Sequence, residues 1–405
     1  MVKFTKIFLI AAVVFYAAFR LSGIDSEVGG LYFSYAEAMV SGRMPYSGFD
    51  AEYPPFAMLL ILLPRLISWS SFTYQIAFGI EAYFFLLAGL YWTYGIAEKY
   101  TDKPGRIADL YIVFTIILLD FVLDRYDVFP MVMLIGAVYF FTKEKYCAAW
   151  FMMALGIVTK LYPAVAAPFF LFYHLIRKDY KNAGKGILIC AVTAALCMLP
   201  FIIADAGTAF DFLTYHMDRG LQTETLWANV IMLLGHFDIV DISYVFNYGS
   251  DNIAGDVPDA VAKVLTPIML FCLLALYVLY LFVSRKEKEK EALPALIVLS
   301  YLAVMVFMLT NKVLSSQYLV WMIPFTALLV MFVGGEKGRL VMWIFTACIA
   351  LTQLNLIVNY AFRDAGEEFG LPGILILLAR NILLFVITYY IVMAASKHLS
   401  SKSEV

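Results

Sequence analysis

Two acidic residues, Asp25 and Glu27, follow directly after the first apolar segment of the chain. A carboxylate at that position lies where lipid meets water, so it can reach substrates from either phase. Either residue could act as a general base that deprotonates a hydroxyl nucleophile. The alternative is a solvated acidic loop, because the segment 23–52 holds five acidic residues and one arginine.

Four cationic side chains lie in or beside other predicted outer turns. They are Arg125, Lys160, Arg219 and Lys312. Burying such charges near a membrane is costly, so we expect each to have a partner and a function. Arg125 can pair with its neighbours Asp124 and Asp127, whereas Lys160 and Lys312 have no carboxylate close by in the sequence. We expect those two lysines to face an anion, for which phosphate is the natural candidate. The alternative is that each side chain snorkels to the interface.

The stretch 215–227 combines hydrogen-bond donors, acceptors and aromatic rings more densely than a plain linker does. Arg219, Gln222, Glu224 and Trp227 suit a carbohydrate, which needs planar hydrogen-bonding side chains and an apolar ring face as its partners. His216 could bind a phosphate or act as an acid, or it could simply donate a hydrogen bond. The sequence therefore predicts a polar ligand site in this stretch.

The composition indicates that membrane-embedded elements must position these residues. Of the 405 residues, 63% are hydrophobic and 15% are charged, and the mean hydropathy is +0.83. Soluble domains keep about a quarter of their residues charged, so the solvent of this chain must be lipid. The net charge of −2 excludes a polybasic nucleic-acid surface. The five cysteines lie in apolar runs and are expected to be unpaired core residues.

Apolar runs mark the candidate membrane helices, each of which needs about 20 residues. The runs are 7–22, 54–68, 73–97, 107–123, 127–142, 145–158, 162–176, 184–204, 262–284, 292–310, 318–334, 338–360 and 371–395. Several are short, which suits helices that bend or end inside the protein. Prolines and the basic stretch 98–106 indicate that 54–68 is a partial helix, so we expect about twelve crossings, within a range of about eleven to thirteen.

Basic residues in the short loops predict the orientation. Both termini, including the tail 396–405, are expected in the cytoplasm of a multi-pass cell-membrane protein that forms a single integral domain over residues 1–405. The first loop 23–52 and the long loop 205–261 then lie outside, with the candidate site residues. The sequence has no P-loop, GxGxxG, HExxH or CxxC motif, and no segment is large enough for a nucleotide-binding domain. An enzyme of this design must draw an activated substrate from the lipid phase.

Five blocks give the chain a family resemblance. They are Tyr32–Pro55, Asp124–Asp127, Thr159–Pro163, His216–Thr225 and Lys312–Trp321. In this order they resemble the polytopic GT-C glycosyltransferases, and among them glycosyltransferase family 87. The resemblance implies an all-α, GT-C-type bundle of membrane helices with a cavity on the outer face.

The resemblance also implies an activity. The chain would be a hexosyltransferase that moves a sugar, with mannose the family-level expectation, from a polyprenyl-phosphate donor to a lipid or glycan hydroxyl with inversion. The base would be Asp25, which we prefer, or Glu27. The donor phosphate would be bound by Lys160, His216, Arg219 and Lys312. Further substrate contacts are expected from Asp50, Glu52, Tyr53, Arg125, Asp127, Tyr162, Gln222, Glu224 and Gln317. Nothing in the sequence demands a metal or cofactor.

A transporter or flippase of a lipid-linked or polar solute is the rival hypothesis. It predicts functional charges within the membrane helices, whereas few acids lie there, namely Glu81, Asp109 and Asp120. No inverted repeat is apparent, which also weakens this alternative.

Overall fold

The computed structural model describes residues 26–286, 289–364 and 370–400. The apolar run 7–22 and the candidate base Asp25 lie outside this range. The described chain is almost entirely helical and divides into two compact units. The first unit contains the described residues up to Ala167, with Arg177–Met217 and Val320–Pro324. The second contains Pro168–Ile176, Asp218–Leu319 and the described residues from Phe325 onward.

In the first unit, the first two described elements lie within the segment 23–52, and the other helices follow it. Its elements are η1 (Val28–Tyr32), α2 (Phe33–Val40), α3 (Pro55–Leu62), η2 (Leu63–Ile67), α4 (Ser71–Ala97), α5 (Pro104–Ile117), α6 (Leu119–Leu123), α7 (Val128–Thr142), α8 (Tyr146–Thr159), η3 (Tyr162–Val165), α10 (Tyr180–Ala204) and α11 (Asp211–Asp218), which extends one residue beyond the unit. Local signals begin several of them. Ser70 and Thr73 form a capping box at α4, and Pro55 and Pro104 occupy the first turns of α3 and α5.

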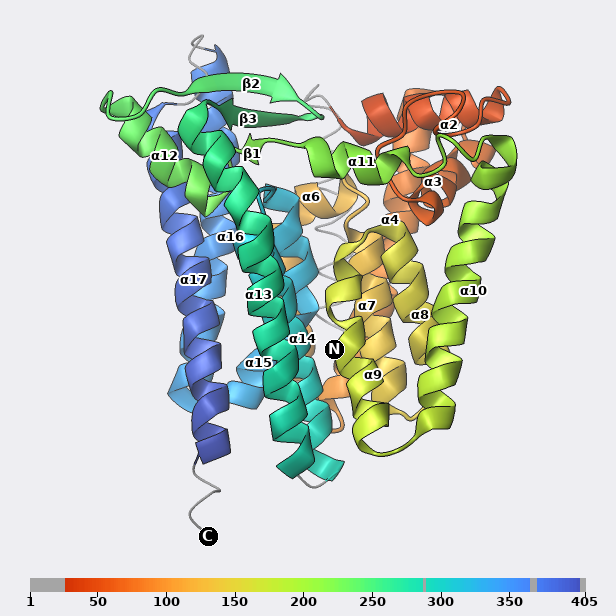
Figure 1. Cartoon of the computed structure of the whole chain (residues 1–405), viewed down its shortest axis with the longest axis vertical. Helices are drawn as coiled ribbons and strands as arrows, with labels where there is room; N and C mark the ends of the chain where they lie inside the picture. Colours follow the sequence, from red (N-terminus) through yellow and green to blue (C-terminus); the bar gives the residue numbers. More distant parts are fainter. Residues whose placement is uncertain (1–25, 287–288, 365–369, 401–405) are drawn as a thin grey trace. The chain divides into compact units, whose positions relative to one another are not determined.

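The second unit holds most of the remaining helices and a small sheet (Figure 1). Its elements are α9 (Ala167–Ile176, from its second residue), β1 (Leu221–Gln222), α12 (Leu226–His236), β2 (Ser243–Asn247), β3 (Ser250–Ala254), α13 (Asp256–Lys286), α14 (Glu289–Thr310), the start of η4 (Ser316–Met322), α15 (Ile323–Val333, from its third residue), α16 (Gly335–Asp364) and α17 (Leu371–Ser400). Within this unit, α13 packs against α14, and α17 packs against α12 and α16.

Seven of the described helical segments are long and apolar enough to cross a membrane. They are Ser71–Ala97, Tyr180–Ala204, Asp256–Phe282, Ala292–Thr310, Ser316–Val333, Gly335–Val358 and Leu371–Met393. Several other apolar helices have 10–17 residues. The α7 helix, with 15 residues, is buried along almost its whole length between α4 and α8. The burial of α7 agrees with the prediction that some apolar runs end inside the protein. Taken with the seven long apolar segments, the described chain has the architecture of an all-α polytopic membrane protein.

The run 54–68 forms α3 followed by the 3₁₀ turn η2, together 13 residues from Pro55 to Ile67. At 1.5 Å per residue it extends about 20 Å, which is shorter than a bilayer core of about 30 Å. This length agrees with the expected partial helix. The run 107–123 differs from its prediction, because the helix is interrupted at Leu118 between α5 and α6.

The segment 205–261 is not the loop that the sequence predicted. It contains α11, α12 and a three-stranded antiparallel sheet in the order β1-β3-β2. The β2–β3 hairpin turns at Tyr248 and Gly249, which have φ angles of 49° and 63°. Two positive φ angles define the tight turn that two-residue hairpins favour. The strands have only two to five residues, so no long alternating pattern marked them in the sequence.

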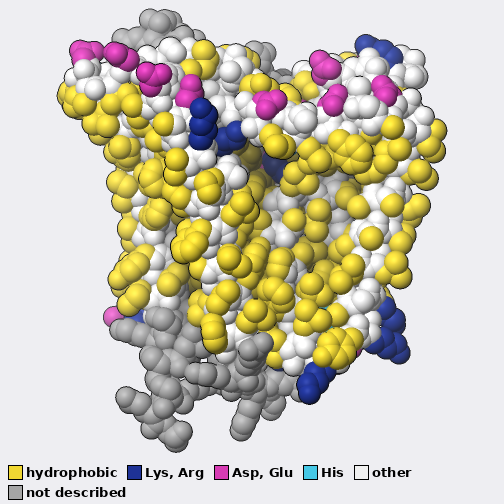
Figure 2. Space-filling view, in the orientation of Figure 1, with side chains coloured by type: hydrophobic (Ala, Val, Ile, Leu, Met, Phe, Trp, Pro, Cys, Tyr) yellow, Lys and Arg dark blue, Asp and Glu magenta, His cyan; other side chains and the backbone are white. Residues whose placement is uncertain are grey.

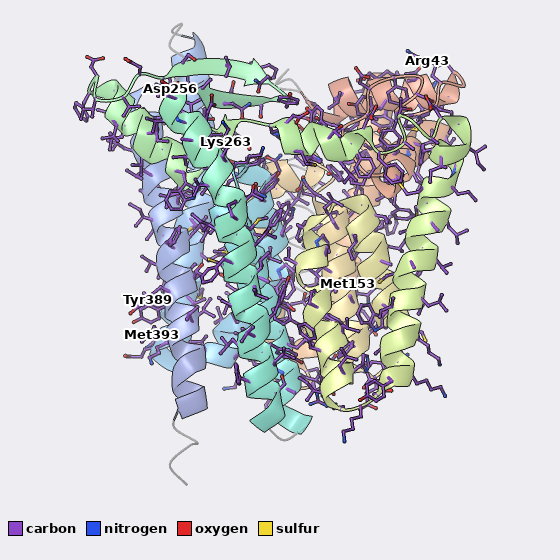
Figure 3. All side chains as sticks on the ribbon, viewed as in Figure 1. Arg43, Met153, Asp256, Lys263, Tyr389 and Met393 are labelled. Carbon is purple, nitrogen blue, oxygen red and sulfur yellow. The ribbon has the colours of Figure 1, made fainter. Side chains whose placement is uncertain are left out.

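Side-chain types are sorted along each unit. Hydrophobic side chains cover the sides of the helices (Figure 2). In the first unit, Lys and Arg gather where α10 begins, and Asp and Glu gather over α2 at the other end of its helices. In the second unit, Asp256 and Lys263 lie near the start of α13, whereas Tyr389 and Met393 lie toward the opposite end of α17 (Figure 3). Which end faces the cytoplasm stays a prediction.

Candidate active site

The Glu27 carboxylate, immediately before η1, is held by two side chains of the first unit. Its Oε2 atom lies 3.2 Å from the Arg125 guanidinium, and Tyr53 donates its hydroxyl to Oε1 at 3.3 Å. Tyr53 is buried, whereas the Glu27 side chain is 29% exposed. The carboxylate is therefore fixed in orientation and still open to a substrate.

The turn after α6 fixes the backbone on which Glu27 lies. Asp124 accepts hydrogen bonds from the Ser26 hydroxyl and, at 3.2 Å, from the Glu27 amide. It also pairs with Arg125 at 3.0 Å. Burial alone would lower the pKa of Arg125, but the carboxylates of Glu27 and Asp124 raise it above its ordinary value. Arg125 is thus a permanent cation between two acids. The sequence predicted its pair with Asp124 but not its pair with Glu27.

The predicted pair of Arg125 with Asp127 is wrong, because Asp127 pairs with Lys160 instead. The Lys160 ammonium lies 2.7 Å from Asp127 Oδ1, and the Trp321 indole donates to the same oxygen at 2.6 Å. The expectation that Lys160 has no carboxylate partner is therefore also wrong. Lys160 and Asp127 are 33 positions apart in the sequence, so only the fold makes them neighbours.

Aromatic rings line this ion pair. The Tyr162 ring stacks on Trp321 with centroids 3.8 Å apart and planes within 4°. The Lys160 ammonium lies 4.7 Å from the ring centroid of Tyr126 and 5.1 Å from that of Trp321, within cation–π range. Asp127 is only 1% exposed. The cluster therefore combines a buried ion pair with three rings.

The other candidates in the first loop lie in different surroundings. Asp50 is exposed and Glu52 is half-buried. The pKa of Tyr35 is raised mainly by burial and further by the charge of Glu52, which places that carboxylate near Tyr35. Glu37 pairs with Arg65.

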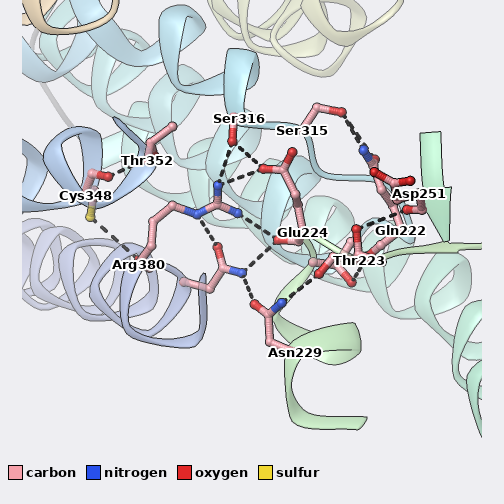
Figure 4. A network of polar contacts seen from close by, with 12 residues as sticks. Gln222, Thr223, Glu224, Asn229, Asp251, Ser315, Ser316, Cys348, Thr352 and Arg380 are labelled. Carbon is pink, nitrogen blue, oxygen red and sulfur yellow. Dashed lines mark hydrogen bonds and ion pairs between the residues drawn. The ribbon is translucent and has the colours of Figure 1, made fainter. Parts of the chain in front are cut away.

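Three predicted residues of the second unit belong to one polar network. Gln222 donates its amide to Ser315 Oγ at 2.9 Å, and its backbone N–H donates to the Lys312 carbonyl at 3.0 Å. Glu224 accepts from the Ser316 hydroxyl and pairs with Arg380 at 2.9 Å (Figure 4). The structure thus joins the predicted stretch 215–227 to the predicted segment around Lys312.

Arg219 and Lys312 also lie close enough to influence each other. The pKa of Lys312 is lowered, first by burial and then by the charge of Arg219, while Asp218 opposes the shift. Asp218, which is distant from Lys312 in the sequence, is therefore close to it in the fold. Arg219 donates to Ser250 Oγ at 2.8 Å. The two cations therefore lie near each other in the second unit.

Two remaining candidates have less definite surroundings. His216 lies in the last turn of α11, in the first unit, with its ring 5.6 Å from that of Tyr215. Gln317 is half-buried in η4. The four predicted phosphate ligands are thus divided, with Lys160 and His216 in the first unit and Arg219 and Lys312 in the second.

Three residues that anchor these clusters were not among the predicted site residues: Trp321, which ends the block Lys312–Trp321, and Arg380 and Asn381. Arg380 and Asn381 interrupt the apolar run 371–395, and a charge inside such a run is a recognised sign of function. That signal was available in the sequence. Among the residues that the structure describes, no group of three or more His, Cys, Asp or Glu side chains could hold a metal ion.

Comparison with solved structures shows the fold. The chain is similar to ArnT from Cupriavidus metallidurans bound to undecaprenyl phosphate, with 11% identity, a TM-score of 0.52, and coverage of 97% of this chain and 76% of that one. The apo state of the same protein gives 13% identity, a TM-score of 0.39 and coverage of 94% and 76%. A comparison with curated proteins found no match.

Helical architecture and structural similarity together define the class, which is that of polytopic membrane proteins with the GT-C fold. The family follows from the sequence model of glycosyltransferase family 87, which matches residues 52–310. This chain belongs to that family and is a membrane glycosyltransferase. The predicted family and fold class are confirmed. The first-loop acids Asp25 and Glu27 precede the matched range.

Proposed function

We propose that the protein transfers a hexose, with mannose the first candidate, from a polyprenyl-phosphate donor to a hydroxyl of a lipid or glycan acceptor on the outer face of the cell membrane. The observation that carries the proposal is the Glu27 carboxylate, which is oriented by Arg125 and Tyr53 and remains partly exposed. The undecaprenyl phosphate bound to the ArnT structure supports a donor of this chemical class.

The proposed step is a single displacement. The Glu27 carboxylate removes the proton of the acceptor hydroxyl, whose oxygen forms a bond to the anomeric carbon. The bond from that carbon to the phosphate oxygen breaks, and the phosphate leaves with the electron pair. Attack from the side opposite the leaving group inverts the anomeric centre. No metal or cofactor enters this proposal.

Arg219 and Lys312 are proposed to stabilise the leaving phosphate, because the fold places these two cations in one neighbourhood. His216 remains a proposed phosphate ligand from the sequence alone. We assign Lys160 to Asp127 instead, since a 2.7 Å ion pair already occupies its ammonium. Tyr53 and Arg125 are proposed to orient the base, and Gln222 and Glu224 to hold the backbone near Lys312.

The test is transfer in proteoliposomes with radiolabelled polyprenyl-phosphate-mannose and an acceptor lipid extract. Replacing Glu27 by Gln should lower kcat by about 10²–10⁴-fold, because a positioned general base contributes that much. Asp25→Asn should cost less. Glu37→Gln serves as the control, since Glu37 lies in the same segment 23–52 as Glu27 and pairs with Arg65 of η2. Thermal unfolding of each variant separates loss of chemistry from loss of fold.

Each outcome decides one part of the proposal. Full activity of both Glu27→Gln and Asp25→Asn would refute a first-loop base. Loss with Asp25→Asn alone would move the base to Asp25. A panel of other polyprenyl-phosphate sugars decides the hexose. Movement of an unaltered lipid across the bilayer, without transfer, would favour the rival transporter function.

A further inference from the structure

Arg380 is an arginine inside a membrane helix. It belongs to the span Leu371–Met393 of α17, and it is 1% exposed. A charged side chain at membrane depth is costly and is retained where it has a function. The Arg380 guanidinium has partners for its charge, because it donates four hydrogen bonds. Its Nε donates to Asn381 Oδ1 at 3.1 Å, NH1 to Glu224 Oε2 at 2.9 Å and Ser316 Oγ at 3.2 Å, and NH2 to the Glu224 carbonyl at 2.8 Å.

These partners come from two segments that are distant in the sequence (Figure 4). Glu224 follows β1, and Ser316 begins η4. The Ser316 hydroxyl also donates to the Glu224 carboxylate, so that three groups meet at one point. Asn381 adds a bond from its amide to the Glu224 carbonyl at 2.9 Å. Arg380 therefore connects both segments to α17.

The same two segments are bonded to each other through Gln222. Its backbone N–H donates to the Lys312 carbonyl, and its side chain donates to Ser315 Oγ. Arg219 lies two residues before β1. Arg219 lies five residues before Glu224, and Lys312 lies four residues before Ser316, so both cations are close along the backbone to the residues that Arg380 binds.

We propose that Arg380 is a positioning residue, which acts through Glu224 and Ser316 to hold the backbone that carries Arg219 and Lys312. This inference rests on the proposed function, in which those two cations bind the donor phosphate. The planar guanidinium suits the task, because its donors have fixed directions that can hold a carboxylate, a hydroxyl and a carbonyl at once. An ammonium has the charge but not this geometry.

The first experiment measures whether Arg380 holds the two segments, by hydrogen exchange of the full-length protein in detergent. Arg380→Gln should increase amide exchange in both segments, 221–225 and 311–316, because their shared anchor is lost. Arg380→Lys should give a smaller increase. The control is Arg339→Gln, since Arg339 forms an exposed pair with Glu336 on the neighbouring helix α16. Unchanged exchange in both segments of Arg380→Gln would overturn the inference.

The second experiment measures transfer kinetics. Displaced phosphate ligands should raise the KM for the polyprenyl-phosphate donor about tenfold and leave the acceptor KM unchanged, because binding of one substrate is lost. A merely structural defect lowers the amount of active enzyme without changing the donor KM. Increased exchange with an unchanged donor KM would therefore overturn the positioning role.

The two experiments separate this inference from the proposed function. If the wild-type chain transfers no sugar from any polyprenyl-phosphate donor, the proposed function fails, and the positioning of a donor site fails with it. The hydrogen-exchange result then still decides whether Arg380 holds the two segments. A raised donor KM in both Arg380→Gln and Glu224→Gln, with Arg380→Lys intermediate, supports the inference.

Discussion

Lys160→Met is the most informative single change in the first unit, because the structure assigns this lysine to Asp127 and not to a phosphate. The Asp127 carboxylate is 1% exposed and receives one bond from Lys160 and one from Trp321. Removing the ammonium leaves a buried charge with one neutral N–H donor. Removing one partner of a buried pair costs about 3–5 kcal/mol. Lys160 is 16% exposed, so we expect a loss near the lower limit, about 3 kcal/mol.

A double-mutant cycle measures how much of this loss depends on the Asp127 charge. In the Asp127→Asn background the buried charge is absent, so Lys160→Met should destabilise the protein much less. The coupling between the two positions should be about 1–3 kcal/mol, as found for residues in direct contact. The free energy of unfolding is measured in mixed micelles with increasing denaturing detergent. Additive single changes would refute the argument.

Transfer kinetics of the same variant test the reassignment of Lys160. After correction for the folded fraction, Lys160→Met should leave the KM for the donor unchanged, because the ammonium is held by Asp127. A raised donor KM together with unchanged stability would contradict the structural assignment. It would restore the phosphate role that the sequence predicted.

Two further predictions concern packing and the indole of Trp321. A Cβ added at Gly186 would clash with the ring of Trp150, so Gly186→Ala should destabilise the protein by about 1–3 kcal/mol. Gly184→Ala on the same helix, where nothing lies within 4 Å of the added Cβ, should be neutral or slightly stabilising. Detergent unfolding measures both, and equal effects would contradict the contact. Trp321→Phe keeps a ring for stacking and removes the N–H bond to Asp127, which should cost about 1–3 kcal/mol. An unchanged stability would show that this bond contributes nothing.

The long apolar runs predicted the membrane helices well. The run 184–204 corresponds to α10 and the run 371–395 lies within α17, because about 20 consecutive apolar residues are enough to specify a spanning helix. Prediction failed where length and hydropathy carry little information. The interruption at Leu118 and the β2–β3 hairpin depend on local backbone geometry and on packing against neighbours.

Several charged residues that the sequence selected form ion pairs in the structure, but most of their partners were not predicted. Glu27, the block Asp124–Asp127, Lys160 and Glu224 were all selected from the sequence, because charged groups are rare in this chain and their positions are conspicuous. Their partners were assigned by proximity in the sequence, which gave Arg125 one correct partner, Asp124, and one wrong partner, Asp127, and gave Lys160 none.

By itself, the sequence determined that lipid is the solvent of this chain and at which residues most of its helices lie. It also indicated which few charged residues are candidates for a chemical role. Only the tertiary structure decided most of the partners with which these charged side chains form ion pairs and hydrogen bonds. Trp321 meets Asp127 across 194 positions, and Arg380 meets Glu224 across 156. The physical reason is range. Hydropathy acts on each segment alone, whereas a buried charge takes its partner from whichever segment the packing of the helices brings within about 3 Å.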